Sequence, residues 1–252
     1  MRHALGIYDI LRIDHFRGFD TYWAIPAGET TAKNGRWEQG PGMELFRALR
    51  TALGDLPIVA EDLGELFDSV RELLKASGFP GMKVLQFGLD GTDNEYLPHN
   101  YPANCVCYPG THDNDTLLGW WENGAAEAER RQLTEYLALT PAEGVKNGVL
   151  RGVLASPALL AVIPMADWLG LGSEARINVP GRADGNWQWR AADTALTTEL
   201  AAEIRTMTAR YFRARKPKAE PAAAAAKEPA AKPDKAQKVR TDAKKAERAV
   251  KK

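Results

Sequence analysis

The chain has 252 residues, 44% of them hydrophobic, and its 33 basic and 33 acidic side chains give a formal net charge of zero. This length suffices for one large domain with a substantial core, and no apolar run approaches the roughly 20 residues that span a bilayer, so we predict no membrane segment. The charge is uneven: residues 216–252 hold 12 Lys or Arg and 5 Asp or Glu, which leaves residues 1–215 acidic and argues against a nucleic-acid partner for them.

Five short apolar runs predict strands that are covered on both faces. They are Tyr8–Ile13, Leu56–Ala60, Met82–Leu89, Cys105–Tyr108 and Leu159–Met165. Apolar residues at helical spacing predict helices between and after these runs. These helices are Met43–Leu53, Glu65–Ala76, Ala125–Leu139, Pro141–Leu154 and Ala195–Phe212. Strands that alternate with helices indicate a parallel sheet with crossover connections.

The loops after the strands are longer and richer in Gly, Trp, Asp and Asn than those before them. This asymmetry fits a (β/α)8 TIM barrel, whose chemistry lies at the carboxyl ends of its strands. An open doubly wound sheet places ligands at the same edge, although no glycine-rich nucleotide loop supports it. Five strands are fewer than eight, so we expect residues 1–215 to form the C-terminal part of a barrel that lacks its N-terminal strands.

Residues 216–252 consist mostly of Ala, Lys, Pro and Glu. Such a segment buries too little apolar area to offset its ordering entropy, so we predict a disordered basic tail, with a weak electrostatic arm for anionic polymers as the alternative. Cys105 and Cys107 are the only cysteines. We expect both cysteines to be reduced core residues of a cytoplasmic protein. We also expect their side chains to point to opposite faces of an extended run and to form no disulfide.

Carboxylates follow three of the apolar runs: Asp14, Glu61 and Asp113. Arg12 and Asp14 share a strand face, and a neighbouring guanidinium favours the ionised carboxylate that a nucleophile requires; an ordinary ion pair has the same pattern. Glu61 suits a proton donor, although a helix-capping Glu-Asp pair is an equal interpretation, and Asp62 is predicted to cap the helix near residue 65.

His112 beside Asp113 suits contact with a sugar hydroxyl, and the other histidines show no zinc spacing, so we predict no metal. Aromatic residues accompany these acids, and their rings can stack on the apolar faces of sugars, although each ring alone is more often part of a core. These aromatic residues are Tyr22, Trp23, Trp37, Tyr101, Trp120, Trp121, Trp187 and Trp189.

Several stretches, in register along residues 1–213, resemble the 4-α-glucanotransferases (amylomaltases) of glycoside hydrolase family 77. They are Arg12–Phe19, Gly35–Trp37 with Gly40–Gly42, Ala60–Gly64, Pro80–Phe87, Leu97–Tyr101, Gly110–Thr116, Leu169–Arg176, Asn178–Gly181 and Gly185–Arg190. The resemblance implies a (β/α)8 barrel and transfer of α-1,4-glucan segments with retained anomeric configuration.

By the same resemblance, Asp14 is expected to be the nucleophile, Glu61 the general acid/base and Asp113 the transition-state stabiliser. Arg12 is expected to orient the nucleophile and His112 to bind a hydroxyl of the donor sugar. Further substrate contacts are implied for Asn178, Asp90, His99 and Asn100. No cofactor is expected.

Two alternatives stay open: an amylase-type α-glucan hydrolase, and a non-catalytic remnant that binds glucan or a partner. The expected partners are an α-1,4-glucan or maltooligosaccharide and an N-terminal half of the same enzyme. Because an unclosed barrel exposes strand edges, we expect this chain alone to be unstable, to aggregate or to need that partner.

Overall fold

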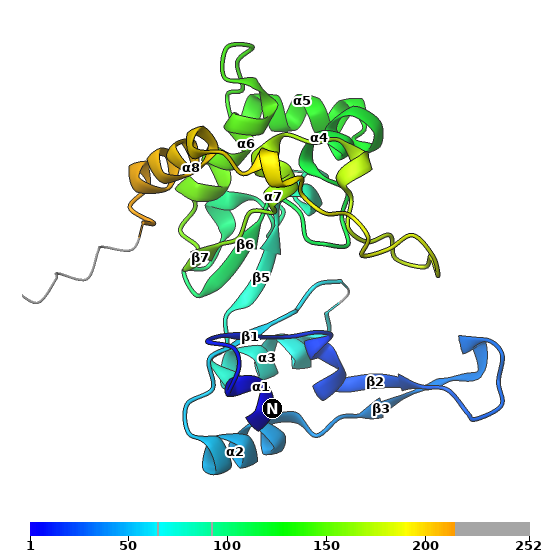
Figure 1. Cartoon of the computed structure of the whole chain (residues 1–252). Helices are drawn as coiled ribbons and strands as arrows, with labels where there is room; N and C mark the ends of the chain where they lie inside the picture. The colour runs from blue at the N-terminus through cyan, green and yellow to red at the C-terminus, as the bar shows by residue number, and fades with distance from the viewer. Residues whose placement is uncertain (65, 92, 215–252) are drawn as a thin grey trace, which may run out of the picture. The chain divides into compact units, whose positions relative to one another are not determined.

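The computed structural model describes residues 1–64, 66–91 and 93–214 (Figure 1). Residues 1–214 form one unit of packed helices and strands. The predicted tail at residues 216–252 lies outside the described residues. No helix in the described part of the chain is long and apolar enough to cross a membrane.

Five short strands form two parallel sets, each in the order of the chain. They are β1 (Leu11–Ile13), β4 (Ile58–Ala60), β5 (Gly81–Val84), β6 (Cys105–Tyr108) and β7 (Leu160–Ala161). β1 pairs with β4, and β6 pairs with both β5 and β7. The backbone N–H of Ala60 donates to the carbonyl of Pro80 (2.9 Å), which joins β4 to the start of β5. The predicted parallel arrangement of alternating strands and helices is therefore confirmed.

Eight α-helices are described. They are α1 (Arg2–Leu5), α2 (Gly42–Leu53), α3 (Asp68–Ser77), α4 (Leu117–Gly119), α5 (Glu127–Tyr136), α6 (Gly144–Ala155), α7 (Met165–Leu169) and α8 (Thr198–Arg210). A π-helical turn at Trp120–Gly124 continues α4. All five predicted helices are present, with ends that differ by a few residues. α3 ends as expected at Gly78, whose φ of 69° is left-handed and suits glycine.

Four of the five predicted strands are longer than the observed ones, and the fifth, Cys105–Tyr108, has its predicted bounds. The run from Met82 ends its pairing at Val84 and continues as a 3-10 turn at Leu85–Phe87, while β7 has two residues before α7 begins at Met165. The antiparallel hairpin of β2 (Thr21–Ala24) and β3 (Arg36–Gln39) is a feature that the apolar pattern does not predict. Its residues are exposed or half-buried, so the sequence carries no core-facing alternation there.

Successive side chains along the parallel strands point to opposite faces and pack in different hydrophobic cores. Val59, Met82 and Val106, from β4, β5 and β6, pack on one another and form the inner face of the array. Ile58 and Ala60 point the other way and pack with Phe16 and Phe46 against α2 and α3. A cavity of about 520 Å³ is lined by Ile10 and Leu56–Val59 at one side and by Val106 and Leu159–Leu160 at the other, so residues at both ends of the strand order line one space.

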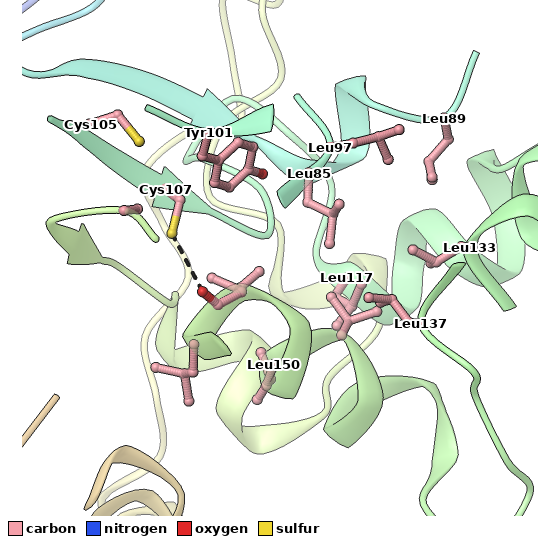
Figure 2. Close-up of a cluster of buried hydrophobic side chains, with 14 of the residues drawn as sticks. Leu85, Leu89, Leu97, Tyr101, Cys105, Cys107, Leu117, Leu133, Leu137 and Leu150 are labelled. Carbon is pink, nitrogen blue, oxygen red and sulfur yellow. Dashed lines mark hydrogen bonds between the residues drawn. The ribbon is translucent and has the colours of Figure 1, made fainter. Parts of the chain in front are cut away.

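The largest core lies between β6 and helices α5 and α6, and Figure 2 shows Cys105 and Cys107 among its leucines. Both thiols are free and buried, as predicted. The expectation of opposite faces was wrong: residues two apart in a strand share a face, and it is the intervening Val106 that points to the inner face. The Sγ of Cys107 lies 3.3 Å from the Oγ of Ser156, and burial raises the pKa of both thiols.

Candidate active site

Asp14 and Glu61 directly follow neighbouring parallel strands. Ile13 lies opposite Ala60, and the N–H of Glu61 donates to the carbonyl of Ile13 (2.9 Å). Backbones of adjacent strands are about 4.8 Å apart, so the two carboxylate-bearing residues are neighbours. Arg12 lies opposite the inward-facing Val59. Asp14 and Glu61 each come two positions after that pair, which directs both side chains to the inner face.

Arg12 joins the end of β1 to β5. Its Nη1 lies 2.8 Å from the Oδ1 of Asp14, and its Nε lies 3.3 Å from the Sδ of Met82 on β5. Burial raises the pKa of Tyr108 on β6, and the positive charge of Arg12 works against that rise. The guanidinium therefore lies over the inner face, in contact with a carboxylate that is itself largely exposed, with a side-chain exposure of 76%. This arrangement can orient the Asp14 carboxylate toward a ligand.

The Glu61 carboxylate is held by two backbone donors. The N–H of His15 donates to Oε2 (2.6 Å), and the N–H of Leu63 donates to Oε1 (2.9 Å). His15 has a φ of 49°, a left-handed conformation that is uncommon outside glycine. This turn after Asp14 brings the His15 N–H to the neighbouring carboxylate. The orientation of Glu61 is thus tied to the loop that carries Asp14.

Asp113 lies after β6 in a second cluster. The Nδ2 of Asn178 donates to its Oδ1 (2.6 Å), and the Nε2 of His112 lies 3.4 Å from its Oδ2. The ring of Trp187 is 5.2 Å from the His112 ring, and Trp187 is 56% exposed. The structure therefore brings the predicted residues His112, Asp113 and Asn178 together beside an exposed indole. A carboxylate held in this way can stabilise positive charge on a bound ligand.

Arg176 is a member of this cluster whose role the sequence did not indicate. Its Nη2 donates to the carbonyl of Asp113 (2.7 Å), and its Nε donates to the carbonyl of Asn178 (2.9 Å). One guanidinium thus joins the two loops. The only available signal was its place next to Asn178 among the matching stretches, because these contacts are to backbone carbonyls, which leave no trace in sequence.

The predicted contacts Asp90, His99 and Asn100 lie in the long connection between β5 and β6. The Oδ1 of Asp90 accepts a hydrogen bond from Asn94 (2.5 Å), and the His99 ring contacts the hydroxyl of Tyr136 (2.9 Å). Asn100 lines a cavity of about 400 Å³ to which Glu95 also contributes.

Tyr96, a half-buried residue of this connection, has a perturbed hydroxyl. The pKa of Tyr96 is raised to about 12, first by burial and then by the charges of Glu95 and Asp62, and Glu61 adds a smaller effect. The side-chain hydrogen bonds of Asp90, His99 and Asn100 are to Asn94 and Tyr136, not to the predicted catalytic residues.

Asp62 does not cap a helix. Its Oδ1 accepts a hydrogen bond from the N–H of Met82 (2.6 Å), and α3 begins only at Asp68 with Phe67 at its N-cap. Burial raises the pKa of Asp62, and the bond from Met82 and the charge of Lys83 partly offset the rise. The prediction failed because the helix starts later than its apolar pattern suggests, which leaves Asp62 free to join β4 to β5.

The aromatic residues divide into two groups. Tyr101 is buried and its hydroxyl donates to the carbonyl of Tyr96 (2.9 Å), and Trp120 and Trp121 are half-buried against the largest core, so these three rings contribute to packing. Trp23 and Trp37 are exposed on the β2–β3 hairpin. Within the described residues no group of three His, Cys, Asp or Glu side chains is placed to hold a metal ion.

Comparison with known proteins gives concordant matches. The family model described as 4-alpha-glucanotransferase, glycoside hydrolase family 77, matches residues 1–197. The 4-alpha-glucanotransferase of Clostridium butyricum is 50% identical over 214 residues, which are 84% of this chain and 44% of that protein. The enzyme of Thermus thermophilus is 46% identical over 215 residues, covering 82% of this chain and 43% of the relative.

A solved structure matches as well. The amylomaltase from Streptococcus agalactiae in complex with acarbose superposes with a TM-score of 0.81 at 39% identity, over 85% of this chain and 43% of that one. The chain thus spans less than half the length of the relatives it matches.

Proposed function

The chain belongs to the 4-alpha-glucanotransferase family, glycoside hydrolase family 77, and on this premise we propose that it carries the catalytic carboxylates of an enzyme that transfers α-1,4-glucan segments to a 4-hydroxyl acceptor. The observation that supports this most directly is the in-register pairing of β1 with β4. This pairing places Asp14 and Glu61 side by side, with the N–H of His15 hydrogen-bonded to Glu61.

The proposed reaction has two displacements. Asp14 attacks the anomeric carbon of the donor sugar, the bond from that carbon to the departing O4 breaks, and Glu61 gives its proton to that oxygen. Glu61 then takes a proton from the 4-hydroxyl of the acceptor, the acceptor oxygen bonds to the anomeric carbon, and Asp14 leaves. Two inversions retain the configuration, a route that needs carboxyl groups about 5–5.5 Å apart, consistent with neighbouring strand ends.

The remaining predicted residues have supporting roles in this proposal. Asp113, held by Asn178, stabilises the positive charge that develops on the sugar ring, and His112 binds one of its hydroxyls. Arg12 orients Asp14 through its ion pair. Asp90, His99 and Asn100 are proposed to contact the sugar chain from the connection between β5 and β6.

We also propose that the five parallel strands are part of a (β/α)8 barrel that an N-terminal half of the same enzyme completes. The strands follow chain order, and Ile10, which precedes β1, and Leu160 of β7 line one cavity. Within the described residues β1 pairs only with β4 and β7 only with β6, and Leu159 and Ile10 nearby are 68% and 54% exposed. Further strands would cover both edges.

Incubation with maltotriose tests the proposed reaction. Transfer yields glucose together with shorter and longer oligosaccharides, whereas a hydrolase yields steadily rising reducing ends. Asp14→Asn and Glu61→Gln should each abolish turnover, while Asp9→Asn, an exposed acid before β1, should not. If wild type turns over maltotriose under the same conditions, full turnover by Asp14→Asn would refute the nucleophile assignment.

A second experiment addresses the partner. The chain is assayed alone, and then mixed with an N-terminal half taken from a full-length relative. Transfer that appears only in the mixture supports completion by a partner. Equal activity of the chain alone would contradict it, and saturable glucan binding without turnover in either sample would favour the non-catalytic alternative.

A further inference from the structure

Three exposed aromatic rings form a cluster outside the hydrophobic cores. The rings of Trp23 and Trp37 are 5.3 Å apart at 72°, and those of Trp37 and Phe67 are 5.4 Å apart at 76°. Their exposed fractions are 38%, 48% and 42%. The guanidinium carbon of Arg17 lies 4.8 Å from the Trp37 ring centre and 4.9 Å from that of Phe67. Large aromatic rings left exposed in a contiguous group commonly mark a binding surface.

The base of this cluster is fixed. Trp23 and Trp37 are cross-strand partners in the β2–β3 hairpin, which Figure 1 shows extending away from α3. At the foot of the hairpin the buried Asp20 accepts a hydrogen bond from Ser69 of α3 (2.8 Å), and its carbonyl accepts one from Gln39 (2.8 Å). The rings are therefore held on a rigid support, which lowers the entropic cost of binding a ligand on them.

The cluster is built from the two loops that carry the proposed catalytic carboxylates. Arg17 and the hairpin follow Asp14 after β1, and Phe67 follows Glu61 after β4. Contact between Trp37 and Phe67 closes these two loops on each other. The three rings and the two carboxylates are therefore carried by the same two loops.

The exposed groups of the aromatic cluster indicate the kind of ligand that it binds. The indole N–H of Trp23 already donates to the carbonyl of Ala32 (2.9 Å), so the group offers mainly apolar ring surface. Glucose units have apolar faces that pack on aromatic rings, while their hydroxyls stay in water.

We propose that Trp23, Trp37 and Phe67 form an accessory surface that binds units of an α-1,4-glucan chain remote from the bond that reacts. The proposal rests on the proposed function for the identity of the ligand. It implies a preference for long chains over short ones, because only a long chain reaches both the carboxylates and the rings.

Binding is tested without turnover, by the retardation of the full chain in a gel that contains glycogen and by titration with maltoheptaose. Trp37→Ala should weaken maltoheptaose binding about fivefold to tenfold, the factor that an aromatic contact of about 1 to 1.4 kcal/mol corresponds to. Trp37→Phe, which keeps an aromatic face, should restore most of the affinity. Ile25→Ala removes an apolar side chain of similar exposure, 47%, from the same hairpin and should change nothing.

Circular dichroism of each variant shows whether the hairpin change has unfolded the chain, and Trp23→Phe provides a second test that removes less volume. Unchanged retardation and affinity for a folded Trp37→Ala would overturn the proposal. The proposal would also be overturned if Trp37→Ala lost concentration-dependent self-association but still bound glucan. The rings would then bind a second copy of the chain.

Failure of this proposal is distinguishable from failure of the proposed function. Where transfer occurs, Trp37→Ala should lower kcat/KM for maltoheptaose but not for maltotriose, and equal effects on both would count against the accessory surface. Where no transfer occurs, the gel and the titration still report binding by the rings.

Discussion

Arg12 makes two contacts with one guanidinium, to the Asp14 carboxylate at 2.8 Å and to the Met82 sulfur at 3.3 Å. A lysine ammonium is a single point charge on a flexible stem and cannot keep both geometries. Arg12→Lys should therefore lower kcat about 10- to 100-fold with a smaller change in KM, since the orientation of Asp14 matters most in the transition state. Steady-state kinetics with maltotriose measure this effect.

Arg205→Lys is the matched control, because Arg205 is exposed on α8. It should behave as wild type. A rise in KM with unchanged kcat in Arg12→Lys would show that Arg12 binds substrate in the ground state rather than orienting the nucleophile.

Strand alternation predicted the Arg12–Asp14 pair, because a period of two depends on backbone geometry alone. The helix-cap prediction for Asp62 was wrong, and its actual contact is with Met82, a residue distant in sequence. A Cβ at Gly81 would lie 2.5 Å from the Oδ2 of Asp62, so the side chain fits only because glycine stands there. A single sequence does not reveal that such a pair meets.

At the level of elements, Asp167 joins α7 to α4. It is 2% exposed and accepts a hydrogen bond from the N–H of Leu117 (2.7 Å). Burial raises its pKa from 3.8 to about 6, against the lowering effect of that bond. The folded state therefore holds this proton more tightly than the unfolded state does. The stabilisation is present below pH 3.8 and is lost as the pH rises to about 6.

Asp167→Asn keeps an acceptor for Leu117 and cannot ionise. Relative to wild type, its free energy of unfolding should rise between about pH 4 and pH 6, by up to about 3 kcal/mol, and then stay level. Urea denaturation at several pH values measures the difference. Asp193→Asn, at an exposed position, should show no such trend, and a parallel pH profile for Asp167→Asn and wild type would contradict the prediction.

Packing of α6 gives a second prediction at this scale. Leu150 is fully buried in the largest core, whereas Leu159, just before β7, is 68% exposed. Leu150→Ala should cost about 2 to 5 kcal/mol of unfolding free energy through lost contacts and a cavity, and Leu159→Ala less than about 0.5 kcal/mol. Chemical denaturation measures both, and similar costs for the two variants would show that the described core is wrong.

Elements with a buried face could be predicted from the sequence, and those without one could not. α2 and α3 show apolar stripes because they cover Phe16 and Ile58. The β2–β3 hairpin has no buried face, so its strands follow no apolar period. The ends of β5 and β7 were also missed, because an apolar run continues through a turn that tertiary contacts impose.

For the whole molecule, the two edge strands have the largest consequences. Leu160 on β7 is 41% exposed and borders an unpaired edge among the described residues, a geometry that favours association between chains. Leu160→Lys should reduce self-association of the isolated chain, as measured by sedimentation velocity. Leu196→Lys adds the same charge at a more exposed position (58%) away from the strands and should reduce it less.

An equal reduction by both variants would mean that net charge, rather than the strand edge, governs association.

The parallel order of the strands was predictable at this scale because alternating strands and helices permit few topologies. The hydrogen bond between Asp113 and Asn178 was not predicted: the resemblance implied separate roles for the two residues, which lie far apart in sequence.

Both cysteines of the chain lie inside the largest core, and Cys107 has no exposed surface. A maleimide or other alkylating reagent can reach them only when this region opens, so the rate of thiol labelling reports the opening free energy of β6 and α6 in the native protein. A bound oligosaccharide or an added protein fragment that slows the labelling can thereby be detected without an activity assay.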